Sequence, residues 1–366
     1  MAEWRCLAEV AVQPEPGRAF TAAGRDSRDH AHFHRDVLRW RTAFTASPAH
    51  AWALHFEDAA CFAAALYGAW HAGKTVVLPG DALAGTQARL QGRVDGFAGD
   101  WPQATLTAPA DDVSATPLQP LDAEAARLVV FTSGSTGEPV AIEKRLRQLD
   151  AEVHALEAAL GPGLEGATVH GTVSHQHIYG LLFRVLWPLS AGRAIVPRAF
   201  FPEDLLAAMD GQDAVLVASP AHLKRLPAQL DWASLHGRLR AVFSSGGVLP
   251  AEAAHEVSRL LGVSPTEILG SSETGGIAWR RWREEQPAWR ALPGVAWRVQ
   301  EGVLEVHSPH LSDAAWWRSQ DRAEPDGCGG FRLLGRADRI VKVEERRVSL
   351  DALERQATEE QHEARD

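Results

Sequence analysis

The residues best suited to bind phosphate form one continuous run, Thr132-Ser133-Gly134-Ser135-Thr136-Gly137. Its two glycines can adopt backbone angles that are closed to other residues, which lets successive N–H groups converge on an anion. Its hydroxyl groups are further hydrogen-bond donors. Ser and Gly also dominate ordinary turns, so composition alone leaves a phosphate-binding turn and a plain surface turn both open.

A second run, residues 68–75, matches the phosphate-binding pattern G-x-x-x-x-G-K-[ST] and ends in Gly73-Lys74-Thr75. That pattern binds phosphate only where its loop follows a strand and opens a helix, so that the helix N-terminus faces the anion. Here a helical pattern precedes Gly73 and a strand pattern follows it. We therefore expect Gly73 to be a left-handed helix cap, and we expect no nucleotide site at Lys74.

The elements that must position these residues alternate along the chain. Strand-like apolar runs occupy residues 75–78, 128–131, 214–218 and 241–243, and helical periodicity occupies residues 59–70, 149–160 and 251–261. Such alternation predicts an α/β fold with mainly parallel sheets, whose ligands bind at the carboxyl ends of the strands. We expect the phosphate-binding run to join a strand to a helix. Beyond residue 303 the pattern favours a smaller, antiparallel β-rich part.

Composition and charge exclude several classes of protein. The 366 residues are 45% hydrophobic and 23% charged, as in ordinary globular proteins, and the formal net charge is −10. Lys and Arg are scattered, so no basic surface for nucleic acid is expected. No stretch reaches the roughly 18 apolar residues of a membrane span. The first ten residues lack the features of a secretory signal, and we expect a cytoplasmic protein.

Metal sites built from cysteine or histidine are not expected. The cysteines lie far apart, at positions 6, 61 and 328, and follow no metal-ligand or disulfide spacing. His30, His32 and His34 alternate and could hold a metal. Because no cysteine or evident carboxylate completes a ligand set, we expect them in a surface strand or loop.

The phosphate-binding run, with Phe131 before it and Glu138-Pro139 after it, resembles the phosphate loop of the adenylate-forming acyl-CoA synthetase superfamily. Further segments resemble motifs of that superfamily, in the same order along the chain. They are residues 176–180 (the histidine segment), 244–250 (the adenine-side segment), 269–276 (the signature segment), Asp321 ahead of Gly330-Phe331, and 335–342 (the hinge segment). Each alone could be an ordinary turn or surface strand. Their joint order argues against chance.

The resemblance implies a site for ATP. It assigns the phosphates to Thr132, Ser133, Gly134, Ser135, Thr136 and Gly137, the adenine side to Gly246, Gly247, Gly270 and Ser271, and the ribose to Asp321 and Arg336. A carboxylate can accept hydrogen bonds from both ribose hydroxyls, which suits Asp321 to this role.

The resemblance also implies the reacting centre. It assigns Mg²⁺ to Glu273 and Thr136, and a hard cation that bridges phosphate oxygens suits a carboxylate ligand. Ser272 stands where the superfamily usually has a Thr that contacts the α-phosphate. His177 is expected to line the pocket for the acid and to move as substrate enters. Tyr179, Gly275 and Gly276 complete that pocket, and small residues there would suit a flat acid.

The implied reaction is ATP-dependent activation of a carboxylic acid to an acyl-adenylate with release of pyrophosphate. The acyl group would then pass to the thiol of coenzyme A or of phosphopantetheine on an acyl carrier protein. The chain looks most similar to ligases of bacterial aryl-polyene and xanthomonadin pigment clusters, which implies a hydroxybenzoate-type acid. A medium-chain fatty acid ligase, a catalytically impaired acyl or nucleotide binder, and an NTPase built on Lys74 are the alternatives.

The chain departs from the superfamily at several positions. Val140 replaces the lysine that usually follows the phosphate-loop proline, Leu269 replaces an adenine-stacking tyrosine, and Glu345 replaces a glycine. Lys144, Arg145 and Arg147 lie just downstream of Val140. They could supply the missing charge, although a solvated helix face is the commoner place for such residues.

The length also departs from the superfamily, in which a small domain of roughly one hundred residues follows the hinge and carries a lysine. About thirty residues follow the expected hinge pivot, Asp338, and Lys342 is the last lysine. We therefore expect residues 1–337 to form the large adenylate-forming domain, and residues 338–366 to be the hinge and the start of a shortened C-terminal domain.

Overall fold

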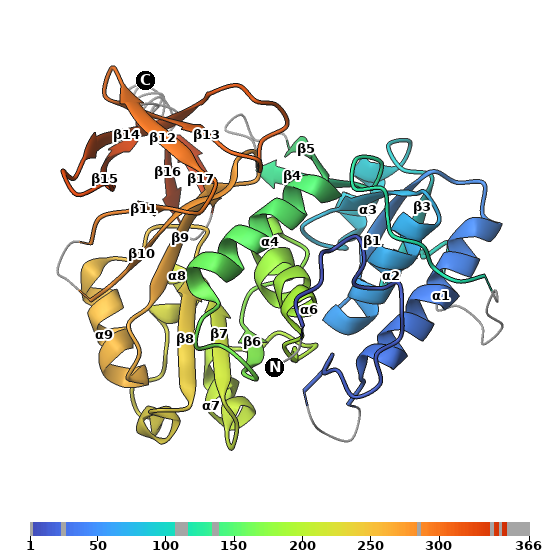
Figure 1. The fold of residues 1–366 in the computed structure, drawn as a ribbon, viewed down its shortest axis with the longest axis horizontal. Coiled ribbons are helices and arrows are strands. Elements are labelled where there is room, and N and C mark those ends of the chain that lie inside the picture. The colour runs from blue at the N-terminus through green and yellow to red at the C-terminus, as the bar shows by residue number, and fades with distance from the viewer. Residues whose placement is uncertain are drawn as a thin grey trace, which may run out of the picture.

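The structure, a computed structural model, describes residues 3–22, 27–106, 116–133, 139–283, 287–336, 340–343 and 346–349. Figure 1 shows two α/β units side by side and a smaller β-rich part above one of them. The mainly parallel α/β architecture predicted from the alternating pattern is confirmed, as is the antiparallel part beyond residue 303.

The first unit is a five-stranded sheet in the order β3-β1-β2-β4-β5. Its strands are β1 (Ala51–His55), β2 (Thr75–Leu78), β3 (Gly96–Gly99), β4 (Arg127–Ser133) and β5 (Pro139–Arg145), and its helices are α1 (His30–Ala46), α2 (Ala59–His71) and α3 (Ala84–Leu90). β5 runs antiparallel to β4, whereas the other pairings are parallel. The edge strand β5 therefore reverses the chain immediately after residues 134–138.

The second unit is a six-stranded sheet in the order β11-β10-β9-β8-β7-β6. Its strands are β6 (Thr168–Gly171), β7 (Ala214–Ala218), β8 (Leu239–Ser244), β9 (Thr266–Ser271), β10 (Gly275–Arg281) and β11 (Arg290–Ala291). β6 to β9 are parallel, and β10 returns antiparallel to β9. The signature segment spans the end of β9, the turn that follows it and the start of β10.

Helical segments connect and flank these strands. They are α4 (Leu146–Leu160), α5 (Ile178–Leu181), the π-helix η1 (Leu182–Leu186), α6 (Trp187–Ala191), the 3₁₀ turns η2 (Pro202–Asp204) and η3 (Trp232–Leu235), α7 (Leu205–Met209), α8 (Pro220–Leu223) and α9 (Ala251–Leu261). The left-handed Gly262 (φ 69°) ends α9, and Gly192 (φ 66°) ends α6.

The β-rich part is an antiparallel sheet in the order β12-β13-β14-β15. Its strands are β12 (Ala296–Gln300), β13 (Val303–His307), β14 (Trp317–Pro325) and β15 (Phe331–Arg336), and a separate hairpin pairs β16 (Ile340–Val343) with β17 (Arg346–Ser349).

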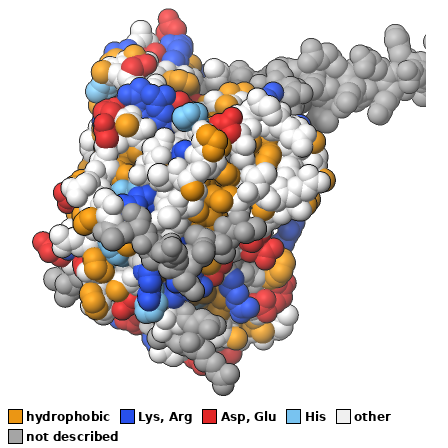
Figure 2. Space-filling view, turned by 90° about the vertical axis from the view of Figure 1, so that its right-hand side faces the viewer, with side chains coloured by type: hydrophobic (Ala, Val, Ile, Leu, Met, Phe, Trp, Pro, Cys, Tyr) orange, Lys and Arg blue, Asp and Glu red, His pale blue; other side chains and the backbone are white. Residues whose placement is uncertain are grey.

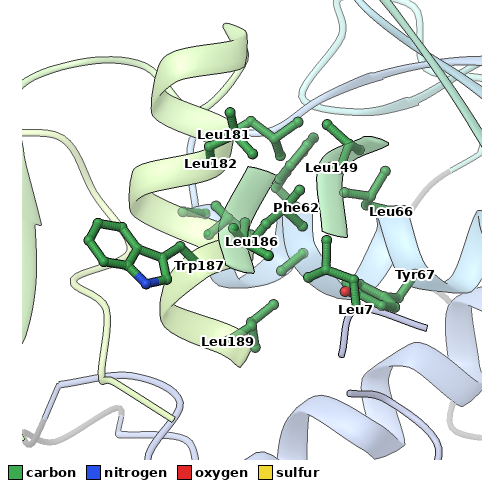
Figure 3. Packing of buried hydrophobic residues seen from close by; sticks show 14 of the residues in the cluster. Leu7, Phe62, Leu66, Tyr67, Leu149, Leu181, Leu182, Leu186, Trp187 and Leu189 are labelled. Carbon is green, nitrogen blue, oxygen red and sulfur yellow. The ribbon is translucent and has the colours of Figure 1, made fainter. Parts of the chain in front are cut away.

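The largest hydrophobic core joins the two α/β units. Figure 3 shows Phe62 and Leu66 of α2 facing Leu149 of α4 and the segment that carries Leu182 and Leu186. All of these side chains are buried, and burying a Leu or Phe side chain contributes about 1.5–3 kcal/mol. The core thus holds α4 and the π-helix rigidly between the sheets, which matters because both reach the candidate site.

Residues 68–75, which match the phosphate-binding pattern, lie between a helix and a strand, as the sequence predicted. Gly73 has φ 70° and stands between the end of α2 and the start of β2. The Lys74 ammonium donates a hydrogen bond to the carbonyl of Ser47 at 2.9 Å. The order is helix, cap, strand, as predicted, so this loop does not open a helix.

Two predictions of local structure were wrong. The phosphate-binding run joins β4 to a second strand, β5, instead of joining a strand to a helix, because Ser133 to Pro139 closes a hairpin in which β5 pairs along the whole of β4. His30, His32 and His34 lie at the start of α1, not in a surface strand or loop. The Asp29 carboxylate caps that helix by accepting from the His32 amide, and Phe33 and Val37 supply the apolar spacing.

The three histidines of this run bond to different groups. A ring nitrogen of His30 bonds to the carbonyl of Val10, and one of His34 bonds to the carbonyl of Ala11. His32 Nδ1 bonds to the Asp29 carboxylate at 2.6 Å. Within the described ranges, no three His, Cys, Asp or Glu side chains are grouped as a metal site would require.

One face of the molecule carries mixed charge. On the face shown in Figure 2, acidic and basic side chains are interspersed rather than gathered into one patch of either sign. No helix in the described part of the chain is both long enough and apolar enough to cross a membrane.

Candidate active site

A pocket of about 680 Å³ opens where the two α/β units meet. Its walls come from the residues that follow β2, β6, β7 and β8, together with β4, β9, the start of β10, α4 and α5. Carboxyl ends of parallel strands share one edge of a sheet, which explains why residues distant in sequence meet here. The predicted position of the ligand site is thereby matched by a cavity.

The histidine segment forms one side of the pocket. His177 is the N-cap residue of α5, and both His177 and Tyr179 line the cavity. A Cβ at Gly80 would lie 2.8 Å from Cε1 of His177, so only glycine lets the imidazole pack against that turn. The Tyr179 hydroxyl donates to the carbonyl of Ala218 at 3.2 Å, and its ring centroid lies 4.8 Å from that of Phe183.

The π-helix Leu182–Leu186 continues this wall, and Leu182 and Phe183 face the pocket. π-helical turns are rare and occur frequently at functional sites. Arg184 within it is buried and donates to the carbonyls of Val173 (2.7 Å) and Arg198 (2.8 Å). Burial lowers the pKa of Arg184 to about 10. The guanidinium thus fixes the stretch after β6, a role that no sequence motif indicated.

The signature segment forms the opposite side. Gly270, Ser271, Ser272, Gly275 and Gly276 all line the pocket. The turn is closed by its own hydrogen bonds, because the Ser271 amide donates to Thr274 Oγ1 at 3.1 Å and the Thr274 amide donates to Ser271 Oγ at 3.2 Å. Gly275 has φ 68° and therefore occupies the left-handed region.

Glu273 stands at the tip of this turn and is partly buried. Its Oε2 is buried and has no hydrogen-bond partner among the described residues. Leaving such an atom unsatisfied costs about 1–3 kcal/mol or more for a charged group. A bound Mg²⁺ would satisfy it, and Mg²⁺ is typically held by one or two carboxylates plus substrate phosphates. The Glu273 carboxylate is therefore a suitable ligand for the implied Mg²⁺. The second expected ligand, Thr136, lies outside the described residues.

Lys144 is hydrogen-bonded to the turn that carries Glu273. Its side chain is 1% exposed, and its ammonium donates to the carbonyls of Glu273 (2.8 Å) and His310 (3.1 Å). Burial lowers the pKa of Lys144, while the charges of Glu152 and Glu273 oppose that shift. The two arginines that follow in the chain behave as expected for solvated residues, since Arg145 and Arg147 pair with the exposed Glu124. Lys144 instead belongs to the interior.

Glu152 of α4 reaches the same wall. Its Oε1 accepts a hydrogen bond from the Gly276 amide at 2.5 Å, and its side chain lines the pocket although it is only 3% exposed. The floor expected from Gly275 and Gly276 is therefore not a bare glycine surface, because a carboxylate occupies the space beside it. The signal in the sequence was available: Glu152 lies three residues after Leu149, on the apolar stripe of the helix.

The adenine-side segment approaches from β8. Gly246 (φ 92°) and Ser245 line the pocket, and Ser245 Oγ donates to the carbonyl of Ile268 at 2.9 Å. Gly247 is outside the lining and lies beside Pro220. The Leu249 amide donates to the buried Glu267 carboxylate at 3.0 Å, which holds the segment in place.

The two residues expected to bind ribose are brought together outside this pocket lining. Asp321 of β14 and Arg336 of β15 face each other in register, and Arg336 Nη1 lies 3.6 Å from Asp321 Oδ1. The expected hinge pivot, Asp338, lies outside the described residues. So do Gly134, Ser135, Thr136 and Gly137 of the phosphate-binding run, and the side chains of Thr132 and Ser133 are likewise not described.

Comparisons with known proteins agree with this geometry. A family model described as AMP-binding enzyme matches residues 71–306. A 4-coumarate–CoA ligase of Rhodobacter capsulatus is 32% identical over 228 residues, which are 60% of this chain and 54% of that protein. An anthranilate–CoA ligase of Pseudomonas aeruginosa is 27% identical over 285 residues, 68% of this chain and 54% of that protein. The chain thus spans about half the length of the curated relatives it matches.

Solved structures share the fold. ATP-bound MatB from Rhodopseudomonas palustris superposes with a TM-score of 0.75 at 19% identity, over 93% of this chain and 81% of that one. This confirms the fold predicted from the superfamily resemblance.

Proposed function

Because the chain belongs to the AMP-binding enzyme family, we propose that it activates a carboxylic acid with ATP, forming an acyl-adenylate and releasing pyrophosphate. The acyl group then passes to the thiol of coenzyme A or of phosphopantetheine on an acyl carrier protein. One observation carries the proposal: a single pocket joins the histidine, adenine-side and signature segments, which lie far apart in the sequence.

The proposed chemistry needs positioning and charge neutralisation more than a protein nucleophile. A carboxylate oxygen of the acid attacks the α-phosphorus of ATP, and the bond from that phosphorus to the bridging oxygen of pyrophosphate breaks. Ser272, which lines the pocket, is proposed to donate its hydroxyl to the α-phosphate. Glu273 would hold Mg²⁺, which when bound neutralises phosphate charge.

Other residues would orient the reactants. Residues 132–137 are proposed to hold the β- and γ-phosphates, and Asp321 with Arg336 to hold the ribose. Gly246 and Gly270 line the pocket on the side proposed for the adenine, and Gly246 has open space where a side chain would be. His177 lines the pocket beside Gly80, and it is proposed to move as the acid enters. Such alignment lowers the entropic part of the barrier.

For the acid itself we propose a hydroxybenzoate-type aryl acid that is loaded onto an acyl carrier protein, as in the pigment-cluster ligases that the chain resembles. Support comes from the ring-lined wall of the pocket, where Tyr179 and Phe183 lie side by side. Two of the curated relatives carry the names of aryl acids, 4-coumarate and anthranilate. A medium-chain fatty acid is the competing substrate.

ATP–pyrophosphate exchange tests the proposal. The product of the complete gene is assayed with benzoate, hydroxybenzoates, coumarate and medium-chain fatty acids. We expect acid-dependent exchange that is strongest with a hydroxybenzoate. Exchange driven best by a fatty acid would replace the substrate class. Binding of ATP without exchange for any acid would identify a catalytically impaired binder and overturn the enzymatic assignment.

A further inference from the structure

Glu152 is a carboxylate inside the pocket that the reaction outlined above does not use. Its Oε1 accepts from the Gly276 amide, whereas Oε2 has no hydrogen-bond partner in the part of the chain that the structure describes. The side chain is almost fully buried and yet lines the cavity. One carboxylate oxygen is therefore left for a group that enters the pocket.

The two glycines opposite Glu152 are shaped around it. A Cβ at Gly275 would lie 2.5 Å from Oε2 of Glu152, and a Cβ at Gly276 would lie 3.1 Å from Oε1. Any side chain at Gly275 would displace the carboxylate, and the left-handed backbone there already disfavours other residues. The carboxylate thus occupies the space that a side chain at either glycine would need.

A buried cation, Lys144, lies near Glu152. A carboxylate buried without compensation is costly, and a nearby cation reduces that cost. Lys144 is buried within electrostatic range of both Glu152 and Glu273. The carboxyl group already accepts from the Gly276 amide and lines the pocket, so it offers a second oxygen as an acceptor at this wall.

We propose that Glu152 is a specificity-determining residue that accepts a hydrogen bond from a hydroxyl or amino substituent on the ring of the acid. The inference rests on the proposed function and narrows it to aryl acids that carry a ring donor. An unsubstituted ring or an alkyl chain would bury the Glu152 oxygen without a partner. Sites built to hydrogen-bond a substrate hydroxyl reject analogues that lack it far more strongly than apolar pockets reject a missing methylene.

The competing explanation is that Glu152 only holds the Gly276 amide in place. The two explanations differ in which substrates respond to its replacement. Glu152→Gln keeps a carbonyl oxygen for the Gly276 amide but presents an amide NH₂ in place of the second acceptor. Loss of a supporting contact would weaken all acids alike, whereas loss of recognition would weaken only acids with a ring donor.

The experiment measures kcat/KM in pyrophosphate exchange for hydroxybenzoate, aminobenzoate, benzoate and octanoate, with the complete gene product and its Glu152→Gln variant. The control variant is Glu143→Gln, an exposed carboxylate on the neighbouring strand β5. Calorimetric binding of hydroxybenzoate and benzoate to the unmodified protein is a second readout that does not depend on the variant or on turnover.

We expect the unmodified protein to prefer hydroxybenzoate over benzoate, and Glu152→Gln to reduce that preference by roughly 10- to 100-fold, mainly through KM. Glu143→Gln should leave the preference unchanged. Equal use of substituted and unsubstituted acids, or an equal loss for all acids in Glu152→Gln, would overturn the inference while the proposed function stands. Exchange with none of the acids would overturn both.

Discussion

Two buried lysines make similar hydrogen bonds to main-chain carbonyls but have different roles. Lys74 follows α2, and Lys144 lies near the end of β5, and each ammonium donates to backbone carbonyls. Lys74 belongs to a run that matches a phosphate-binding pattern, yet it only ties the start of β2 to Ser47. Lys144 belongs to no pattern, yet it holds the turn that carries Glu273. The order of helix and strand around a lysine therefore predicts its role better than a match to a short sequence pattern does.

The largest effect is expected from replacing Glu273, which lies in the turn that Lys144 holds. Glu273→Gln keeps the size of the side chain but removes the charge of the Oε2 that lacks a partner among the described residues. We expect pyrophosphate exchange to fall by roughly 10²–10³-fold, the usual effect of losing one group that stabilises the transition state. Titration with Mg²⁺ in the presence of ATP should show weaker metal binding. A variant with unchanged metal dependence would show that this carboxylate is not a ligand.

Removing the ammonium at Lys144 should have the next largest effect. Lys144→Met leaves the carbonyls of Glu273 and His310 without this donor and leaves Glu152 and Glu273 less compensated. We expect a loss of about 3 kcal/mol in the free energy of unfolding, measured by urea denaturation. We also expect weaker Mg²⁺ binding in the folded variant. A loss below about 0.5 kcal/mol, the scatter of neutral surface changes, would contradict the role assigned to Lys144.

Lys74→Met tests whether Lys74 has a structural role or belongs to a nucleotide site. It removes one hydrogen bond to Ser47 and keeps most of the buried stem, so a loss of about 1 kcal/mol in the free energy of unfolding is expected. Equilibrium binding of ATP to the folded variant should equal that of the unmodified protein. Abolished ATP binding would instead support a nucleotide site at residues 68–75.

The smallest effect is expected where the positive charges face solvent. Glu124→Gln removes the partner of Arg145 and Arg147, whose carboxylate contacts lie at 2.9 and 2.7 Å on an exposed surface. Exposed ion pairs are screened by water and salt and contribute little. Neither the urea midpoint nor the exchange rate should change measurably. A clear drop in exchange would mean that these arginines reach the phosphates.

The sequence allowed the fold and part of the site to be predicted, because those signals are local or ordered along the chain. Apolar runs predicted the parallel strands, and the positions of His177, Gly246 and Ser272 followed from segments of recognisable spacing. β5 was missed because its strand state depends on pairing with β4 across the turn, and residues 139–145 carry only a weak alternation of their own.

The buried charges were missed for another reason. Arg184 and Lys144 donate to carbonyls of residues brought near only by the fold, and hydrogen bonds to main-chain carbonyls place no demand on the type of the partner residue. Glu152 alone left a trace, as a carboxylate on an apolar helix stripe. Charged residues at interior positions of a helix pattern are therefore worth tracing in three dimensions.

The left-handed glycine at position 275 limits which substitutions the pocket wall formed by the signature segment can accept. A side chain there meets both an unfavourable backbone angle and the Glu152 carboxylate, so replacement of this glycine is disfavoured. Variation can enter more readily from α4, where shortening Glu152 would enlarge the cavity without disturbing the turn's own hydrogen bonds. Libraries that aim to retune the enzyme for bulkier acids should begin on that helix and leave the glycine fixed.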